Sequence, residues 1–152
     1  MLRLSRLTDY AVTLLSHMGA EKDVDLWAAP TLAERSGLSL HTVAKILKLL
    51  AKADLVSAQR GAAGGYRLCA PPADISVAAI IEALDGPISI TDCSAHNDRQ
   101  DCKIQHLCPL CAGWNKANIA VREALSSVTL ADLMDPTPFL NSFGKKDGAT
   151  PT

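Results

Sequence analysis

Residues 31–53 read TLAERSGLSLHTVAKILKLLAKA, and this stretch decides the fold. Thr31 and Glu34 have the three-residue spacing of a capping box and predict a short first helix. Gly37 is suited to end that helix, because glycine readily takes the left-handed conformation found at helix C-termini. Ser39 then caps a second helix, which we expect to end near Ala53.

The spacing of three residues in this stretch is typical of a helix-turn-helix. Ala33 stands where the helices touch, Gly37 in the turn and Val43 in the core between them. The residues predicted to face the core are Val43, Ile46, Leu47 and Leu50. The opposite face carries His41, Lys45, Lys48 and Lys52. An ordinary solvated face would show the same stripe, but its place after such a turn favours a DNA recognition surface.

A β-hairpin is predicted directly after the second helix. Two short strands, 55–60 and 66–68, flank the glycine-rich turn Gly61–Gly65. This turn lacks the lysine and the following helix of a phosphate-binding loop, so we interpret the hairpin as a wing. Arg60 stands at its tip, where an arginine can enter a minor groove. Cys69 follows and is interpreted as a small buried hydrophobic residue.

Two further helices flank this unit. Leu7 to Met18 has helical periodicity, and we expect Thr8 at its N-cap and Gly19 at its C-terminus. Ile75 to Leu84 is a short amphipathic helix with Asp74 or Ser76 as its cap. Trp27 is expected to pack on the core. The whole pattern predicts a mainly α fold with a small β-wing.

Four of the five cysteines lie within residues 93–111, CSAHNDRQDCKIQHLCPLC, a polar segment with few apolar anchors. A disulfide framework, a zinc ion or an iron–sulfur cluster would each hold such a segment together. The chain has no apolar run long enough for a membrane span and no apparent signal peptide, so we expect a cytoplasmic protein. That compartment disfavours disulfides. His96 and His106 are interpreted as solvated rather than as ligands.

The end of the cysteine segment leads into a long helix. Pro109 is suited to the first helical position, which would make Cys108 the N-cap and Cys111 the third residue, with both sulfurs converging. A helix N-terminus also favours the thiolate that a metal needs. We expect this helix to reach Val128 and to carry an apolar heptad seam for pairing with a second copy. The seam comprises Leu110, Trp114, Ala117, Val121, Ala124 and Val128.

The charge is unevenly distributed, although the net charge is −1. Residues 1–70 hold nine Lys and Arg against six Asp and Glu, whereas residues 71–152 hold six against ten. Between Ser39 and Leu68 there are five basic residues and one acidic residue. The positive charge therefore lies in the segment that contains the predicted helix-turn-helix and wing, as a DNA-binding face requires.

Four stretches together resemble one known family: LRLSRLTDYAV (2–12), GLSLHTVAKILKLLAKADLV (37–56), RGAAGGYRL (60–68) and the late cysteine cluster. They resemble the winged-helix iron–sulfur regulators of the IscR, NsrR and RirA type, most closely the regulators of SUF-system iron–sulfur assembly. The likeness covers residues 1 to about 135. It implies a winged helix-turn-helix domain (1–88), a cysteine-rich cluster loop (89–108) and a dimerisation helix region (109–134). The remaining tail (135–152) is expected to be disordered because of its proline, glycine and lysine content.

The resemblance also implies site residues. Cys93, Cys102 and Cys108 match cluster ligands. The IscR branch has a histidine at the position of Cys111 as fourth ligand, and the NsrR branch has an aspartate, given by the partner subunit, at the position of Asp9. We prefer Cys111 and keep Asp9 as the alternative, for a 2Fe–2S or 4Fe–4S cluster. The residues placed at DNA are Ser39, His41, Thr42, Lys45 and Arg60.

The function expected from this resemblance is that of an iron–sulfur-cluster-sensing transcriptional regulator. It would be a homodimeric repressor that binds double-stranded operator DNA and controls iron–sulfur assembly or iron homeostasis genes. A nitric-oxide or redox sensor of the same fold is the alternative, as is a zinc-stabilised DNA-binding protein. Only Cys108 and Cys111 have the spacing of a zinc knuckle. We find no substrate site, so an enzyme, including a cluster-dependent redox enzyme, is not expected.

Overall fold

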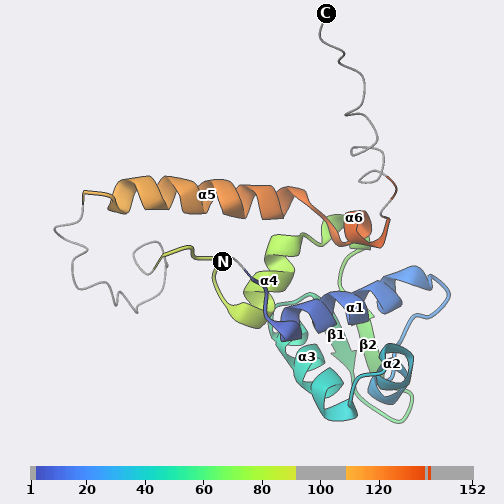
Figure 1. Ribbon diagram of the computed structural model, residues 1–152. Helices are drawn as coiled ribbons and strands as arrows, with labels where there is room; N and C mark the ends of the chain where they lie inside the picture. Colours follow the sequence, from blue (N-terminus) through green and yellow to red (C-terminus); the bar gives the residue numbers. More distant parts are fainter. Residues whose placement is uncertain (1–2, 92–108, 136, 138–152) are drawn as a thin grey trace, which may run out of the picture.

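The computed structural model describes residues 3–91, 109–135 and 137. Within these ranges the chain is mainly helical, with one two-stranded antiparallel sheet (Figure 1). The elements are α1 (Arg6–Ala20), α2 (Ala29–Ser36), α3 (Leu40–Lys52), β1 (Val56–Gln59), β2 (Gly65–Leu68), η1 (Pro72–Asp74), α4 (Val77–Asp85), α5 (Cys111–Ser127) and α6 (Leu130–Met134). The predicted mainly α fold with a β-wing is confirmed.

The helix-turn-helix forms where the sequence predicts it. Gly37 ends α2 in the left-handed conformation, with φ of 70°. Ser39 caps α3, and its Oγ accepts a hydrogen bond from the Thr42 backbone N–H at 3.2 Å. The predicted capping box at Thr31 is wrong: α2 begins at Ala29, after an N-cap residue without a side-chain hydrogen bond.

The core lies between α1, α2, α3 and α4. The four apolar residues predicted for the inner face of α3 are fully buried, and Leu14, Leu15, Leu32 and Ile80 join them. Burying a leucine or isoleucine side chain contributes roughly 1.5–3 kcal/mol. This burial holds α3 at a fixed angle on the domain and leaves its opposite face to solvent.

The wing is attached to the core through Trp27. β1 and β2 pair antiparallel, with Val56 opposite Leu68. Trp27 adds a bridge on the other side of β2: its N–H donates to the Tyr66 carbonyl at 2.8 Å, and the Tyr66 N–H donates back at 2.9 Å. Because Trp27 is only 2% exposed, the predicted core position is confirmed, and it fixes the base of the hairpin.

Gly65 allows this bridge to form. A Cβ atom at this position would lie 2.8 Å from the Trp27 carbonyl oxygen, closer than packed side chains allow. We expect Gly65→Ala to destabilise the fold by roughly 1–3 kcal/mol, as overpacking does, and to weaken DNA binding by displacing the wing. Thermal unfolding measures the loss. Gly113→Ala is the matched control, because a Cβ there meets nothing within 4 Å and alanine favours the helix.

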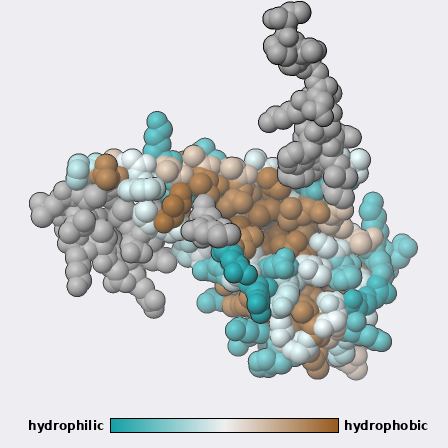
Figure 2. Space-filling view, viewed as in Figure 1, coloured by the Kyte–Doolittle hydropathy of each residue, from teal (hydrophilic) through white to brown (hydrophobic). Residues whose placement is uncertain are grey.

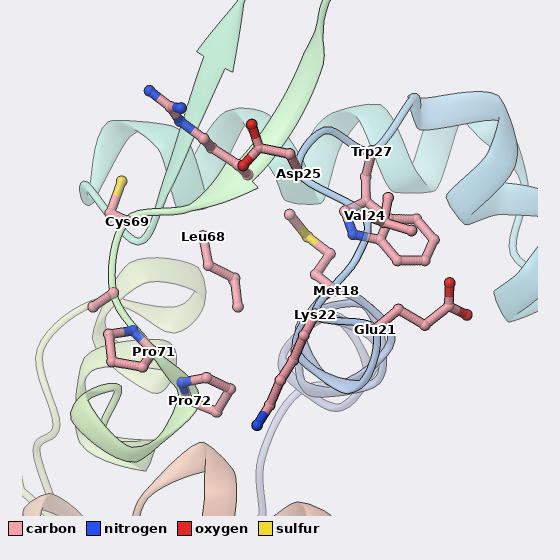
Figure 3. A pocket seen from close by; sticks show the side chains of 13 residues that line it. Met18, Glu21, Lys22, Val24, Asp25, Trp27, Leu68, Cys69, Pro71 and Pro72 are labelled. Carbon is pink, nitrogen blue, oxygen red and sulfur yellow. The ribbon is translucent and has the colours of Figure 1, made fainter.

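Two predictions around the core are wrong. The N-cap of α1 is Ser5 and not Thr8, which is fully buried in the first turn, and the helix continues past Gly19 to Ala20. Cys69 is exposed rather than buried. Figure 3 shows its sulfur pointing away from Pro71 and Pro72, at the rim of a hollow of about 380 Å³ that Trp27 also lines.

The last long helix, α5, projects from the domain as an arm (Figure 1). It packs against α4, and its N-terminal half extends beyond the domain. Thr129 and Asp132 form a capping box that starts α6. Leu130 of α6 is fully buried, which ties the base of the arm to the core. None of the helices in the described part of the chain has the length and hydropathy that a membrane span requires.

Candidate nucleic-acid interface and cofactor site

The outer face of α3 is the first part of the candidate DNA surface. His41 and Lys45 are exposed, as are Lys48 and Lys52 one and two turns further along. Thr42 is partly buried, and its Oγ1 lies 2.8 Å from the Ser39 Oγ. Since both hydroxyls already serve the helix cap, His41 and Lys45 are the groups of this face that are free to reach a base edge.

Arg60 is the second part of the surface. It is exposed and follows the last residue of β1, at the start of the wing turn. The turn is closed by a hydrogen bond from the Gly64 N–H to the Gly61 carbonyl at 3.0 Å, with Gly61 at φ 120°. Arg67 is engaged within the hairpin instead, since its Nε donates to the Ser57 Oγ at 3.3 Å. The predicted surface thus comprises one helix face and one wing arginine.

Three of the four preferred cluster ligands, Cys93, Cys102 and Cys108, lie outside the described residues, as do His96 and His106, which we interpreted as solvated. Cys111 is the first residue of α5, with Leu110 at the N-cap and Pro109 in a turn before it. The prediction of Cys108 as N-cap and Cys111 as third helical residue is therefore wrong. The capping-box argument for convergence of their sulfurs no longer applies. Among the described residues, no group of three or more His, Cys, Asp or Glu side chains could hold a metal.

Asp9, the alternative ligand, is exposed in the first turn of α1. Beside it, the start of α1 is bonded to the end of α4. The Asp85 carboxylate accepts from the Thr8 Oγ1 at 2.8 Å and from the Ser5 N–H at 3.3 Å. Burial raises the pKa of the Asp85 carboxyl, but these hydrogen bonds outweigh it and leave the pKa below its ordinary value.

The Asp85 link makes stability depend on pH. Because the folded-state pKa of Asp85 lies below its ordinary value, its stabilisation is complete above about pH 5 and is lost as pH falls through the folded pKa. We expect Asp85→Ala to lower the free energy of unfolding by about 0.5–1 kcal/mol at pH 7, a small value because the group is exposed. Urea unfolding at pH 7 and pH 3 measures this, and the difference between the two proteins should be smaller at the lower pH.

The segment after α4 is held by a residue that sequence reasoning missed. Asn118 of α5 is buried, at 4% exposure. Its Oδ1 accepts from the Ile90 N–H, and its Nδ2 donates to the Ile88 carbonyl, both at 3.1 Å. The sequence offers only a weak signal, because Asn118 stands between Ala117 and Ile119 but α5 carries a second amide at Asn115.

An apolar hollow of about 550 Å³ lies where α5 meets the α4 end and the N-terminal segment. Val121, Ala124 and Leu125 line it from α5, and Leu4 and Ile88 line it from the other segments. Figure 2 shows hydrophobic residues gathered where α5 meets α4 and α6. Further along the arm, Leu110 and Trp114 are 63% and 44% exposed. A single chain thus leaves three of the predicted seam residues exposed, Ala124 included.

Comparisons with known proteins agree with this architecture. A family model described as Rrf2, iron-dependent transcriptional regulator, matches residues 4–136. The transcriptional regulator IscR of Vibrio atlanticus is 30% identical over 146 residues, which cover 96% of this chain and 83% of the relative.

Two solved structures are similar over most of their length. CymR, the global cysteine regulator of B. subtilis, is 30% identical with a TM-score of 0.65, over 88% of this chain and 97% of CymR. T. potens IscR is 29% identical with a TM-score of 0.60, over 99% of this chain and 94% of that chain. These relatives are regulators and not enzymes. The chain belongs to the Rrf2 family of winged-helix transcriptional regulators, whose partner is DNA.

Proposed function

We propose that this regulator senses an iron–sulfur cluster, held by Cys93, Cys102, Cys108 and Cys111, and represses genes of iron–sulfur assembly or iron homeostasis. The observation that carries the proposal is the clustering of four cysteines within nineteen residues, ending at the first turn of α5. Family membership alone does not carry it, since the family includes a regulator described by its role in cysteine control.

The donor set fits such a group. Four thiolates match the ligand requirement of 2Fe–2S and 4Fe–4S clusters. Cys111 occupies the first position of a seventeen-residue helix, and a helix N-terminus favours the anionic thiolate that a metal needs. The fifth cysteine, Cys69, is on the wing side of the domain and takes no part. When bound, the cluster would supply a redox-sensitive and iron-sensitive crosslink of the segment.

The chain's own residues would then read DNA. His41 and Lys45 would contact base edges from α3, with Arg60 in the adjacent minor groove. Ser39 and Thr42 would lie at the groove as the cap of α3. Lys48 and Lys52 would contact phosphates, which position the protein without reading sequence.

A homodimer is part of the proposal. The exposed Trp114 and Leu110 and the apolar hollow beside Val121 would be covered by α5 of a second copy. Two winged heads would then present their α3 helices to half-sites about 34 Å apart. The hydrogen bonds from Thr8 and Ser5 of the α1 start to Asp85 of α4 would transmit a structural change near the cysteine segment to the winged helix-turn-helix domain, which contains α3.

Operator affinity measured on cluster-loaded and cluster-free protein at one salt concentration tests the proposal. A sensor requires a coupling of roughly 5–150-fold between the two forms. Protein purified without oxygen should be brown and contain iron and acid-labile sulfide. Equal affinities of the two forms would contradict sensing, and colourless protein with one zinc per chain would favour a structural zinc site.

Arg60 is expected to read the operator. Arg60→Ala should cost about 1–3 kcal/mol in specific binding if the guanidinium enters a groove. Fluorescence anisotropy with operator and scrambled duplexes measures this difference. Arg122→Ala is the control, because it removes the same charge from α5, where Arg122 is paired with Glu82 at 2.7 Å. An equal loss on both duplexes would make Arg60 a phosphate contact instead.

A further inference from the structure

The buried side-chain amide of Asn118 has a hydrogen-bond partner for its oxygen and another for its nitrogen. Its side chain is 4% exposed, and both ends are bonded to the backbone of one short segment, to Ile88 and to Ile90. A buried amide without partners is destabilising, whereas this one has a partner for its oxygen and one for its nitrogen. The side-chain amide supplies one acceptor and one donor, here to two residues that are two positions apart in the chain.

The two hydrogen bonds that join Asn118 to Ile88 and Ile90, here called the clamp, lie near both ends of the cysteine segment in the sequence. Ile90 precedes Cys93 by three residues, so the chain between them can span at most about 11 Å. Asn118 follows Cys111 by seven residues on α5, a rise of about 10 Å that brings the two positions to nearly the same side of the helix. Residues 88–90, which lead into the cysteine segment, are therefore bonded to the same helix that begins with Cys111, about two turns further along.

Neighbouring contacts make the anchor rigid. Arg122, one turn beyond Asn118, pairs with Glu82 of α4 at 2.7 Å. The same connecting segment begins at Asp85, which is bonded to Thr8 and Ser5 of the first helix. Asn118 thus fixes the segment against α5 in a region that is also tied to α4 and α1.

We infer that Asn118 is a positioning residue for the cluster, one that holds residues 88–90, which lead into Cys93, against the helix that begins with Cys111. The inference rests on the proposed iron–sulfur function. Groups that orient metal ligands without touching the metal typically change metal affinity by about 10–100-fold when they are removed. A residue that only fastened α5 to the domain would leave cluster release unchanged relative to other destabilising variants.

Three variants test the inference: Asn118→Ala removes both hydrogen bonds, Asn118→Asp keeps only the acceptor, and Asn115→Ala is a control on the same helix. After anaerobic purification, iron and acid-labile sulfide are measured first, and cluster release to a chelator is then followed by visible absorption. We expect release about tenfold faster in Asn118→Ala, an intermediate rate in Asn118→Asp and the wild-type rate in Asn115→Ala. Hydrogen exchange of the Ile90 amide in cluster-free protein should quicken in the same order.

A general loss of stability is separated by a second comparison. Asp85→Ala weakens the same region without touching the clamp, so at matched unfolding free energy it should release the cluster more slowly than Asn118→Ala. Wild-type release in Asn118→Ala, or equal release in both variants, would overturn the inference. Wild-type protein free of iron and sulfide would instead refute the proposed function, and the first measurement distinguishes that outcome.

Discussion

Cys108→Ala is expected to leave a protein that folds and binds DNA but retains less than about a tenth of the wild-type iron and sulfide. Loss of a group that merely orients a ligand already costs about 10–100-fold in metal affinity, so loss of a ligand itself should cost at least as much. Three remaining thiolates leave one coordination position to solvent. Iron analysis, sulfide analysis and visible absorption on anaerobically purified protein measure the result.

Cys69→Ala is the matched control. It removes one of the five thiols, yet Cys69 lies exposed beside the wing, so retention should equal that of the wild type. Wild-type iron and sulfide in Cys108→Ala would remove Cys108 from the ligand set. The same assay on Cys111→Ala and Asp9→Ala identifies the fourth ligand, because only one of the two should lose the cluster.

The helix-turn-helix was predictable because its signals are local. Gly37 adopts the left-handed conformation and Ser39 bonds the N–H three residues on, and both choices are decided within one turn of chain. The apolar face of α3 follows the helical period, so Val43 and Leu47 were placed correctly. The wing was predictable for the same reason, since its turn is rich in glycine.

The starts of α2 and α5 were misplaced by local signals, whereas other errors arise where a distant residue decides the local structure. Thr8 resembles an N-cap, but its hydroxyl donates a hydrogen bond to the Asp85 carboxylate, 77 residues away, and Thr8 lies inside the first turn of α1. Asn118 was overlooked because its partners lie 28 and 30 residues earlier. Cys69 could not be placed, because a thiol carries no sequence signal that separates a buried position from an exposed one. The cluster ligands remain predictions, because Cys93, Cys102 and Cys108 lie outside the described residues.

Trp114→Glu is expected to convert the proposed dimer into a monomer. Trp114 is 44% exposed in the single chain, so a glutamate there should cost the protomer little. In the pair the same position would be buried against a second α5. A buried interface tryptophan typically contributes about 2 kcal/mol to association, whereas an unpaired buried carboxylate opposes it. Losing the second half-site contact should weaken operator binding on the order of 100-fold or more. Sedimentation and operator titration measure both effects.

Ile119→Glu provides the control that makes this test specific. Ile119 is 48% exposed, so the substitution places the same charge on an equally accessible apolar residue of α5. It lies five residues further along, roughly 140° around the helix from Trp114. A seam on the Trp114 side predicts that Ile119→Glu stays dimeric and binds the operator. A dimeric Trp114→Glu with a monomeric Ile119→Glu would place the interface on the other face, and two dimeric variants would exclude α5 from it.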